Sequence, residues 1–269
     1  MNQGDIEEAE KKILSLLRKE MRPLTADYIC NTLNIPKFVA SSALYNLLRK
    51  GLVKRVYTDN YDPTRPFDTA SWIVAKGEVE VKESHGIKEE SAARRTRLVL
   101  SAPLSMSSQR TALLNKYEAL DLHDAYMHII EITKRELKIM CPIIDAYALN
   151  PLVAKIKSSE GLNIKILTEL KKSRNVLQLL GLHRSKNVTI EVRDAERIMK
   201  YGGYEWKAFG IHAKLVIADN ETALIGSFNL SIHHYLVDFD IGFLIDDPEI
   251  VTKLSSIFDA LWDYVSATS

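Results

Sequence analysis

The stretch from Ile211 to Ser231 constrains the fold of this chain more than any other, because polar residues recur in it at fixed spacing. The residues between them are apolar and β-prone, which predicts two short strands joined by a turn at Asp219 and Asn220. The polar and glycine positions of the stretch are His212, Lys214, Asp219, Gly226, Ser227 and Asn229.

The side chains of this stretch are expected to converge on one point. Residues two apart on a strand share a face, so His212 and Lys214 project together. Gly226 permits close backbone approach where the second strand ends, and Ser227 and Asn229 add a hydroxyl and a carboxamide beside it. Such a group suits a phosphate. The alternative is a core histidine that happens to lie beside a solvated lysine.

The spacing H-x-K-x4-D-x6-G-S-x-N resembles the phospholipase D superfamily, often called the HKD family. The resemblance implies that His212 attacks phosphorus to form a phosphohistidine, while Lys214 and Asn229 hold the non-bridging oxygens. It also implies that Asp219 is more structural than chemical. No metal and no other cofactor is then needed, because lysines do the work that divalent ions do in many nucleases.

Members of this family commonly carry an acidic residue, usually Glu, eleven positions beyond the motif asparagine. Here that position is Asp240, which the resemblance implies would orient the nucleophilic His212. The shorter carboxylate departs from the family pattern, and the alternative is a carboxylate satisfied by the backbone at a strand edge. The expected catalytic set is His212, Lys214, Asp219, Ser227, Asn229 and Asp240.

The motif occurs once in the 269 residues. The chemistry of the family needs two facing histidines, one as nucleophile and one to protonate the leaving oxygen. A chain with one motif must obtain the second histidine by two-fold association. We therefore expect a homodimer with one shared site.

The N-terminal part has a different periodicity. Apolar spacing predicts three helices, over about 6–21, 25–33 and 37–50, followed by two strands near 52–57 and 69–74. This order resembles a winged helix-turn-helix domain. Such domains usually bind duplex DNA and insert the third helix into the major groove, whereas some mediate protein contacts instead. Single-stranded DNA is the alternative form of the nucleic acid. The candidate DNA contacts are Lys37, Ser42, Asn46, Arg49, Lys54, Arg55 and Arg65.

Three regions are expected: a DNA-binding domain over 1–80, a charged linker over 81–115, and a phospholipase D-like domain over 116–269. Alternating helix and strand patterns after residue 116 predict an α/β sandwich in which helices cover a mixed sheet. The segment from 194 to 209 is expected to be a loop.

The two cysteines, Cys30 and Cys141, lie far apart in the sequence and signal no disulfide framework. No apolar run is long enough to span a membrane. A cytoplasmic protein is therefore expected.

Two functions remain open. The first is a metal-independent phosphodiesterase or nuclease acting on DNA in restriction, defence or repair. The second is a non-catalytic regulator similar to the TrmB family of archaeal transcription regulators, in which a phospholipase D-like domain dimerises or binds an effector. The complete motif favours the enzyme, because a binding domain has less reason to keep a full nucleophilic set.

Overall fold

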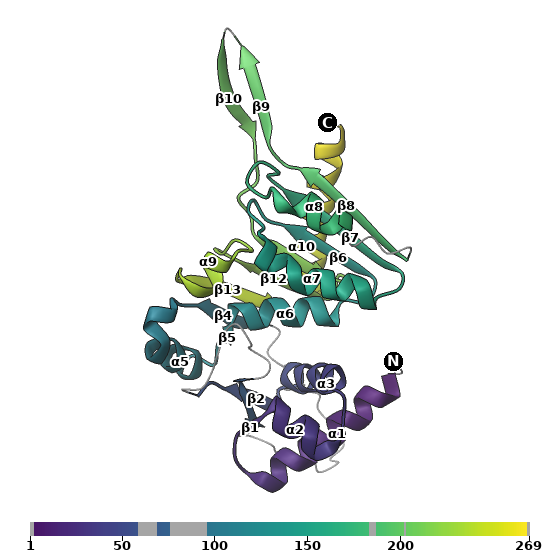
Figure 1. The fold of residues 1–269 in the computed structure, drawn as a ribbon, viewed down its shortest axis with the longest axis vertical. Coiled ribbons are helices and arrows are strands. Elements are labelled where there is room, and N and C mark those ends of the chain that lie inside the picture. The colour runs from purple at the N-terminus through teal and green to yellow at the C-terminus, as the bar shows by residue number, and fades with distance from the viewer. Residues whose placement is uncertain (1–2, 59–68, 76–95, 183–186, 202, 268–269) are drawn as a thin grey trace.

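The computed structural model describes residues 3–58, 69–75, 96–182, 187–201 and 203–267. In its N-terminal part, α1 (Gln3–Glu20), α2 (Ala26–Leu33) and α3 (Lys37–Arg49) pack on a small antiparallel sheet (Figure 1). The sheet order is β1-β3-β2, from β1 (Leu24–Thr25), β2 (Val53–Val56) and β3 (Ser71–Val74). The three predicted helices are confirmed, and the Thr25 side chain caps α2 by accepting the Tyr28 N–H.

This part has its own apolar core. Ile13 and Leu17 of α1 meet Ile29 of α2 and Leu44 of α3, and Trp72 of β3 closes the cluster. All five side chains are buried. Burial of one apolar stripe from each helix explains why the helical spacing of the sequence locates these elements.

The C-terminal part is built on an eight-stranded mixed sheet with the order β5-β4-β13-β12-β11-β6-β7-β8. Strands β6, β7 and β8 are parallel, β4 and β5 are parallel, and the remaining neighbours are antiparallel. The bounds are β4 Thr96–Ser101, β5 Leu120–Asp121, β6 Glu136–Met140, β7 Leu162–Thr168, β8 Val188–Asp194, β11 Leu215–Ala218, β12 Thr222–Gly226 and β13 Asp240–Ile245.

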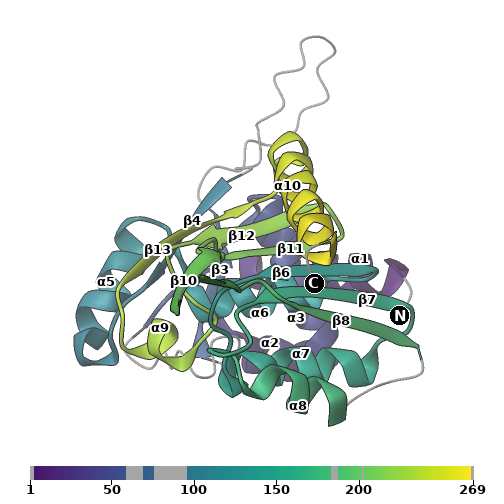
Figure 2. The ribbon, with the colours of Figure 1, turned by 90° about the horizontal axis from the view of Figure 1, so that it is seen from above.

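Helices cover both faces of this sheet (Figure 2). On one face α6 (Leu122–Ile132), α7 (Ala146–Ser158) and α8 (Asn175–Leu182) enclose the larger core. On the other face α10 (Pro248–Ala267) packs through Phe258 and Trp262 onto a second core. The predicted α/β sandwich with a mixed sheet is therefore confirmed.

Two sequence predictions about connections are wrong. The expected linker over 81–115 is part of the sheet from Thr96 onward, because β4 pairs with β13, and 3-10 helix η1 (Leu104–Met106) and α5 (Ser107–Lys116) follow it. Residues 81–95 lie outside the described part. The expected loop over 194–209 contains a hairpin of β9 (Arg197–Tyr201) and β10 (Tyr204–Phe209), which projects from the sandwich (Figure 1).

Among the described helices, none combines the length and the apolar character that crossing a bilayer requires.

Candidate active site

The motif stretch forms two neighbouring strands near the middle of the sheet. β11 pairs with β12 on one side and with β6 on the other, and β12 pairs with β13. Asp219 and Asn220 make the turn between β11 and β12 with φ of 53° and 59°, a left-handed conformation that Asp and Asn tolerate better than other non-glycine residues. The predicted strand-turn-strand unit is confirmed.

Asp219 lies at the opposite end of β11 from His212 and Lys214. Its carboxylate accepts the backbone N–H groups of Lys134, Arg135 and Glu136, each at 2.8 Å. These bonds tie the β11–β12 turn to the start of β6. Asp219 therefore has a structural contact and is not brought together with the other members of the predicted catalytic set.

His212 and Lys214 precede β11 and meet each other. Lys214 Nζ lies 3.1 Å from His212 Nε2 and donates to the His212 carbonyl at 2.7 Å. The lysine is buried, whereas His212 is exposed. The two side chains converge as the spacing predicts.

The ammonium of Lys214 is poorly compensated. Burial lowers the pKa of Lys214, Lys172 lowers it further, and Cys141 and Asp240 act in the opposite direction. Among the described residues, no carboxylate lies within ion-pair distance of Lys214 Nζ. A buried cation without a carboxylate partner is arranged to receive an anion.

Ser227, Asn229 and Asp240 are joined in one network by a residue that the sequence analysis missed, His234. Ser227 Oγ donates to Asp240 Oδ1 at 2.5 Å, and His234 Nδ1 lies 2.7 Å from Asp240 Oδ2. On its other side, His234 Nε2 lies 2.9 Å from Asn229 Nδ2. The network thus runs from the serine to the asparagine of the motif through one carboxylate and one imidazole.

The prediction that Asp240 orients His212 is wrong for the described conformation. The Asp240 carboxylate is occupied by Ser227 and His234. The physical reason is the short helix α9 (Ile232–Leu236), which brings His234 against the start of β13. The signal available in the sequence was a pair of histidines, His233 and His234, between the motif asparagine and the acidic position, but no periodicity marks which of them enters the site.

The buried thiol of Cys141 adjoins both groups of the site, which are the His212–Lys214 pair and the network of Ser227, Asn229, His234 and Asp240. Cys141 Sγ lies 3.8 Å from Asn229 Oδ1. A thiolate at Cys141 would raise the pKa of Lys214. Burial raises the pKa of Cys141 to about 11, so the group remains a neutral thiol near neutral pH. Cys141 is therefore a packing and hydrogen-bonding neighbour of the site.

A three-residue group at this site has metal-ligand chemistry. One ligand atom each of His234, Asp238 and Asp240 lies within 4.8 Å of the others. The sequence analysis anticipated no such cluster. The 2.7 Å separation between His234 Nδ1 and Asp240 Oδ2 is that of a proton shared in a hydrogen bond, which accounts for the contact without an ion.

The predicted DNA contact Arg55 is wrong. Its guanidinium is buried, forms an ion pair with Asp124 of α6, and lies 4.3 Å from the Trp72 ring centroid. A side chain held in this way cannot reach a phosphate. Asn46 is also engaged, because its Nδ2 donates to Glu10 of α1 at 2.9 Å.

The helix that was expected to enter the major groove is covered by the C-terminal part. Ser41 Oγ donates to Glu131 of α6 at 2.5 Å, and Tyr45 Oη donates to Asp124 at 2.7 Å. Burial raises the pKa of Glu131. In this arrangement α3 lies between its own domain and α6, and the sequence could not indicate a contact so distant along the chain.

Of the remaining predicted DNA contacts, the structure describes the side chains of Lys37, Ser42 and Lys54. Lys37 is exposed at the start of α3, 3.9 Å from Asp27, while Ser42 and Lys54 are half-buried. The Arg49 side chain and Arg65 lie outside the described residues.

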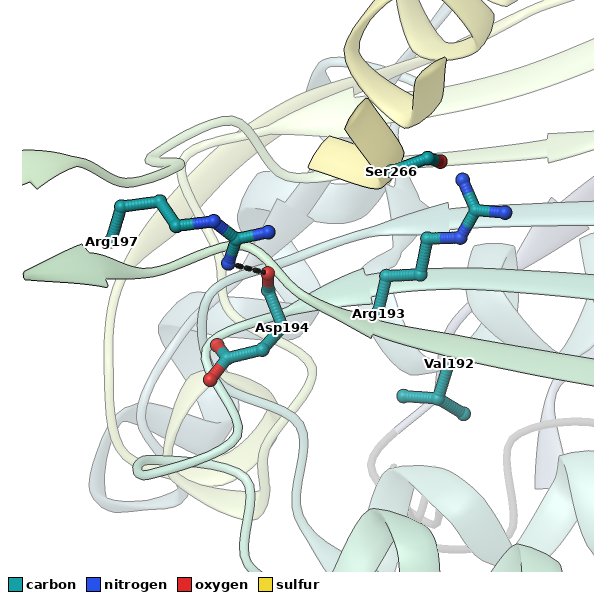
Figure 3. Close-up of a pocket in the computed structure, with 5 residues that line it drawn as sticks. All are labelled: Val192, Arg193, Asp194, Arg197 and Ser266. Carbon is teal, nitrogen blue, oxygen red and sulfur yellow. Dashed lines mark hydrogen bonds between the residues drawn. The ribbon is translucent and has the colours of Figure 1, made fainter. Parts of the chain in front are cut away.

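A pocket at the far edge of the sheet is lined by Val192, Arg193, Asp194, Arg197 and Ser266 (Figure 3). Its two guanidinium groups are occupied. Arg193 donates to the Trp262 carbonyl at 2.8 Å, and Arg197 donates to the carbonyls of Asp194 and Val265. Both arginines thus satisfy carbonyls at the end of α10, a structural use of cations at a helix C-terminus.

The fold and the site together define a phospholipase D-like domain. The family model described as "Cardiolipin synthase, PLD-like domain" matches residues 126–262. The match spans half of the chain and includes β11, β12, β13 and the whole polar network, so the chain belongs to this family.

Solved structures with a similar fold include NucT from Helicobacter pylori, with 18% identity, 62% of this chain and 96% of that chain covered, and a TM-score of 0.44. Nuc from Salmonella typhimurium, a phospholipase D family member, is 15% identical to this chain. The match covers 62% of this chain and 93% of Nuc, with a TM-score of 0.42. TrmBL2, an archaeal chromatin protein, is 13% identical to this chain. The match covers 95% of this chain and 92% of TrmBL2, with a TM-score of 0.34. No curated protein matches the chain.

Proposed function

We propose that this protein is a metal-independent phosphodiesterase that cleaves DNA through a covalent phosphohistidine at His212. The observation that carries the proposal is the buried Lys214 ammonium, which lies 3.1 Å from Nε2 of the exposed His212 and has no carboxylate partner among the described residues. Membership of the phospholipase D-like family supports phosphodiester hydrolysis as the class of chemistry.

His212 supplies the nucleophile. Lys214 Nζ donates toward His212 Nε2, which favours the tautomer with a lone pair on that nitrogen. In the first step a bond forms between Nε2 and phosphorus while the bond from phosphorus to the leaving oxygen breaks. In the second step water attacks phosphorus, the bond to nitrogen breaks, and the imidazole is regenerated.

Lys214 and Asn229 stabilise the charge that develops on the non-bridging oxygens. A buried ammonium is effective here because its charge is little screened and the site needs no reorganisation during the reaction. Ser227 is exposed next to Asn229, and its single O–H donates to Asp240, so it supports the network and leaves the oxygens to Lys214 and Asn229.

A homodimer completes the site in this proposal. The leaving oxygen needs a proton, and a second copy of the motif histidine would provide it as a general acid. The single motif of the chain supports two-fold association, because the two histidines then differ in protonation state only.

DNA is the proposed substrate, and the support for it is that α1, α2 and α3 are followed by β2 and β3, the order expected of a winged helix. Binding of duplex DNA by α3 would require its contacts with α6 to open, since Ser41 and Tyr45 are bonded to Glu131 and Asp124. The proposal therefore includes a rearrangement of the two parts on DNA binding.

The α3–α6 contact also favours a second function, a DNA-binding regulator without catalysis. A ligand bound to the phospholipase D-like part would change the availability of α3 if it altered the position of α6. In such a protein His212 and Lys214 would bind an anionic effector and would not form a covalent bond.

The two functions differ in the fate of a phosphodiester. Purified protein would be incubated with bis(p-nitrophenyl) phosphate, single-stranded DNA and duplex DNA in excess EDTA. The His212→Ala variant should lose about 10³-fold or more in rate, whereas His233→Ala, a change at an exposed neighbour of the site, should behave as wild type. Equal rates for wild type and His212→Ala would favour the regulator.

A further inference from the structure

His234 occupies a place in the site that the motif does not assign. It lies on α9, between the asparagine and the acidic position, and its side chain is 18% exposed. Both ring nitrogens are engaged, Nδ1 with Asp240 at 2.7 Å and Nε2 with Asn229 at 2.9 Å. An imidazole with two polar partners of this kind is held in one orientation.

The partners define which nitrogen carries the proton. A carboxylate only accepts, so the proton lies on Nδ1 and is donated to Asp240. The Nε2 lone pair then accepts from the Asn229 carboxamide nitrogen. This arrangement fixes which end of the carboxamide is nitrogen and leaves its second N–H to be directed elsewhere.

We infer that His234 is a positioning residue of the site, one that orients the Asn229 carboxamide so that its free N–H can bind a non-bridging phosphate oxygen. The inference rests on the proposed function, because it assigns Asn229 to the phosphate. His234 touches no reacting atom and acts through Asn229.

The groups facing His234 are Asp240 and Asp238, whose carboxylate oxygens lie 2.7 and 3.6 Å from Nδ1. Lys214 lies beyond Asp240, and the thiol of Cys141 lies beyond Asn229.

The test uses the full chain with bis(p-nitrophenyl) phosphate. His234→Ala should lower kcat/KM about tenfold, the effect of losing one hydrogen bond to a charged oxygen. His234→Gln can still accept from Asn229, so its kcat/KM should remain near the wild-type value.

His233→Ala is the matched control, because His233 is the exposed neighbour on the same helix. If His234→Ala kept the kcat/KM of this control, the inference would be overturned while the phosphodiesterase function stood. Activity that disappeared in EDTA and returned with Zn²⁺ or Mn²⁺ in the wild type would also overturn it, because the three-residue group would then be a metal site.

A second readout does not depend on turnover. In ¹⁵N-labelled protein, the imidazole resonances assigned with His234→Gln should show that the neutral ring carries its proton on Nδ1. A ring protonated on Nε2 instead would contradict the inference. If His212→Ala and wild type were equally inactive, the proposed function would fail, and this measurement would still show whether His234 holds the carboxamide as described.

Discussion

At the scale of single residues, the site depends on a lysine placed where an ammonium is costly. Folding buries Lys214 beside His212, and Asp240, the carboxylate that raises the pKa of Lys214, is already shared by Ser227 and His234. The pKa of Lys214 is lowered by burial as a result. An incoming phosphate would restore the missing negative charge, which is the physical basis for anion binding at this point.

This lowered pKa predicts an alkaline limit to activity. Raising the pH through it removes the ammonium, so kcat/KM should fall at a pH below 10.5, the ordinary value for lysine. The measurement is a pH profile of kcat/KM for wild type and Lys214→Arg. The arginine keeps its charge to higher pH and should move the limit upward in whatever activity it retains. A limit at the same pH in both proteins would show that another group is responsible.

The residue scale is also where sequence reasoning was least complete. The motif spacing located His212, Lys214, Ser227 and Asn229, because each follows from strand alternation or from the resemblance. It gave Asp240 the wrong partner. The choice between His212 and His234 depends on a five-residue helix and on side-chain reach, and neither leaves a periodic signal.

At the scale of elements, the site depends on two strands that approach unusually closely. Gly226 of β12 is paired with Gly242 of β13, and the ring of Phe228 lies over both. A methyl group added at Gly226 would lie 2.3 Å from the Phe228 ring and 2.8 Å from the Gly242 Cα atom. Glycine at these positions is therefore required by packing, and Gly226 lies directly before Ser227.

Gly226→Ala should destabilise the protein by about 1–3 kcal/mol, because the buried Phe228 ring and the β13 backbone have to move. Equilibrium unfolding in urea would measure the change. Gly181→Ala is the control: this residue lies in α8, has nothing within 4 Å of the added methyl, and should gain about 0.5–1 kcal/mol. Equal effects of the two changes would mean that the close approach of β12 and β13 has no energetic importance.

A second element-scale prediction concerns the turn between β11 and β12. Asp219→Asn keeps a residue that tolerates positive φ but weakens three hydrogen bonds from backbone N–H groups at 2.8 Å. A loss of about 1–3 kcal/mol is expected, with kcat per folded molecule retained. Glu221→Gln, at an exposed position of the same turn, serves as the control in thermal unfolding. A loss of kcat without a loss of stability would give Asp219 a chemical role instead.

Most elements were predictable because each buries one regular stripe or one strand face. The helices α1, α2, α3 and α10 and the strands β6, β7, β11, β12 and β13 follow from this rule. The hairpin of β9 and β10 does not, because Met199, Tyr204 and Trp206 are exposed and neither face is buried in the sandwich. β4 was missed because its pairing partner lies more than 130 residues away in the sequence.

At the scale of the whole molecule, the two parts are joined by a buried polar junction. Arg55 of β2 is paired with Asp124 of α6, and the hydroxyls of Ser41 and Tyr45 add bonds to the same helix. These contacts were not predictable from the sequence. Lys54 and Arg55 are adjacent basic residues in a predicted wing, and such a pair suggests a contact with DNA phosphates. The junction explains why α3 is covered in this structure.

Asp124→Asn should weaken this junction. It leaves the buried guanidinium of Arg55 uncompensated, and loss of one partner of a buried ion pair costs about 3–5 kcal/mol. Unfolding monitored by calorimetry should show a lower midpoint or separate transitions for the two parts. Glu20→Gln, which removes the half-buried partner of the exposed Arg22, should change stability by less than about 1 kcal/mol. A similarly small effect of Asp124→Asn would mean that the junction does not hold α3 against α6.

The most direct test of the proposed mechanism is detection of a phosphorus–nitrogen bond at His212. Protein would be mixed with a phosphodiester substrate in EDTA, quenched in alkali to preserve phosphohistidine, digested, and analysed by mass spectrometry. The mechanism predicts a substrate-derived phosphoryl group on the peptide that contains His212, and none on that peptide in His212→Ala. Turnover that proceeds at the wild-type rate in His212→Ala, or an adduct on another residue, would contradict it.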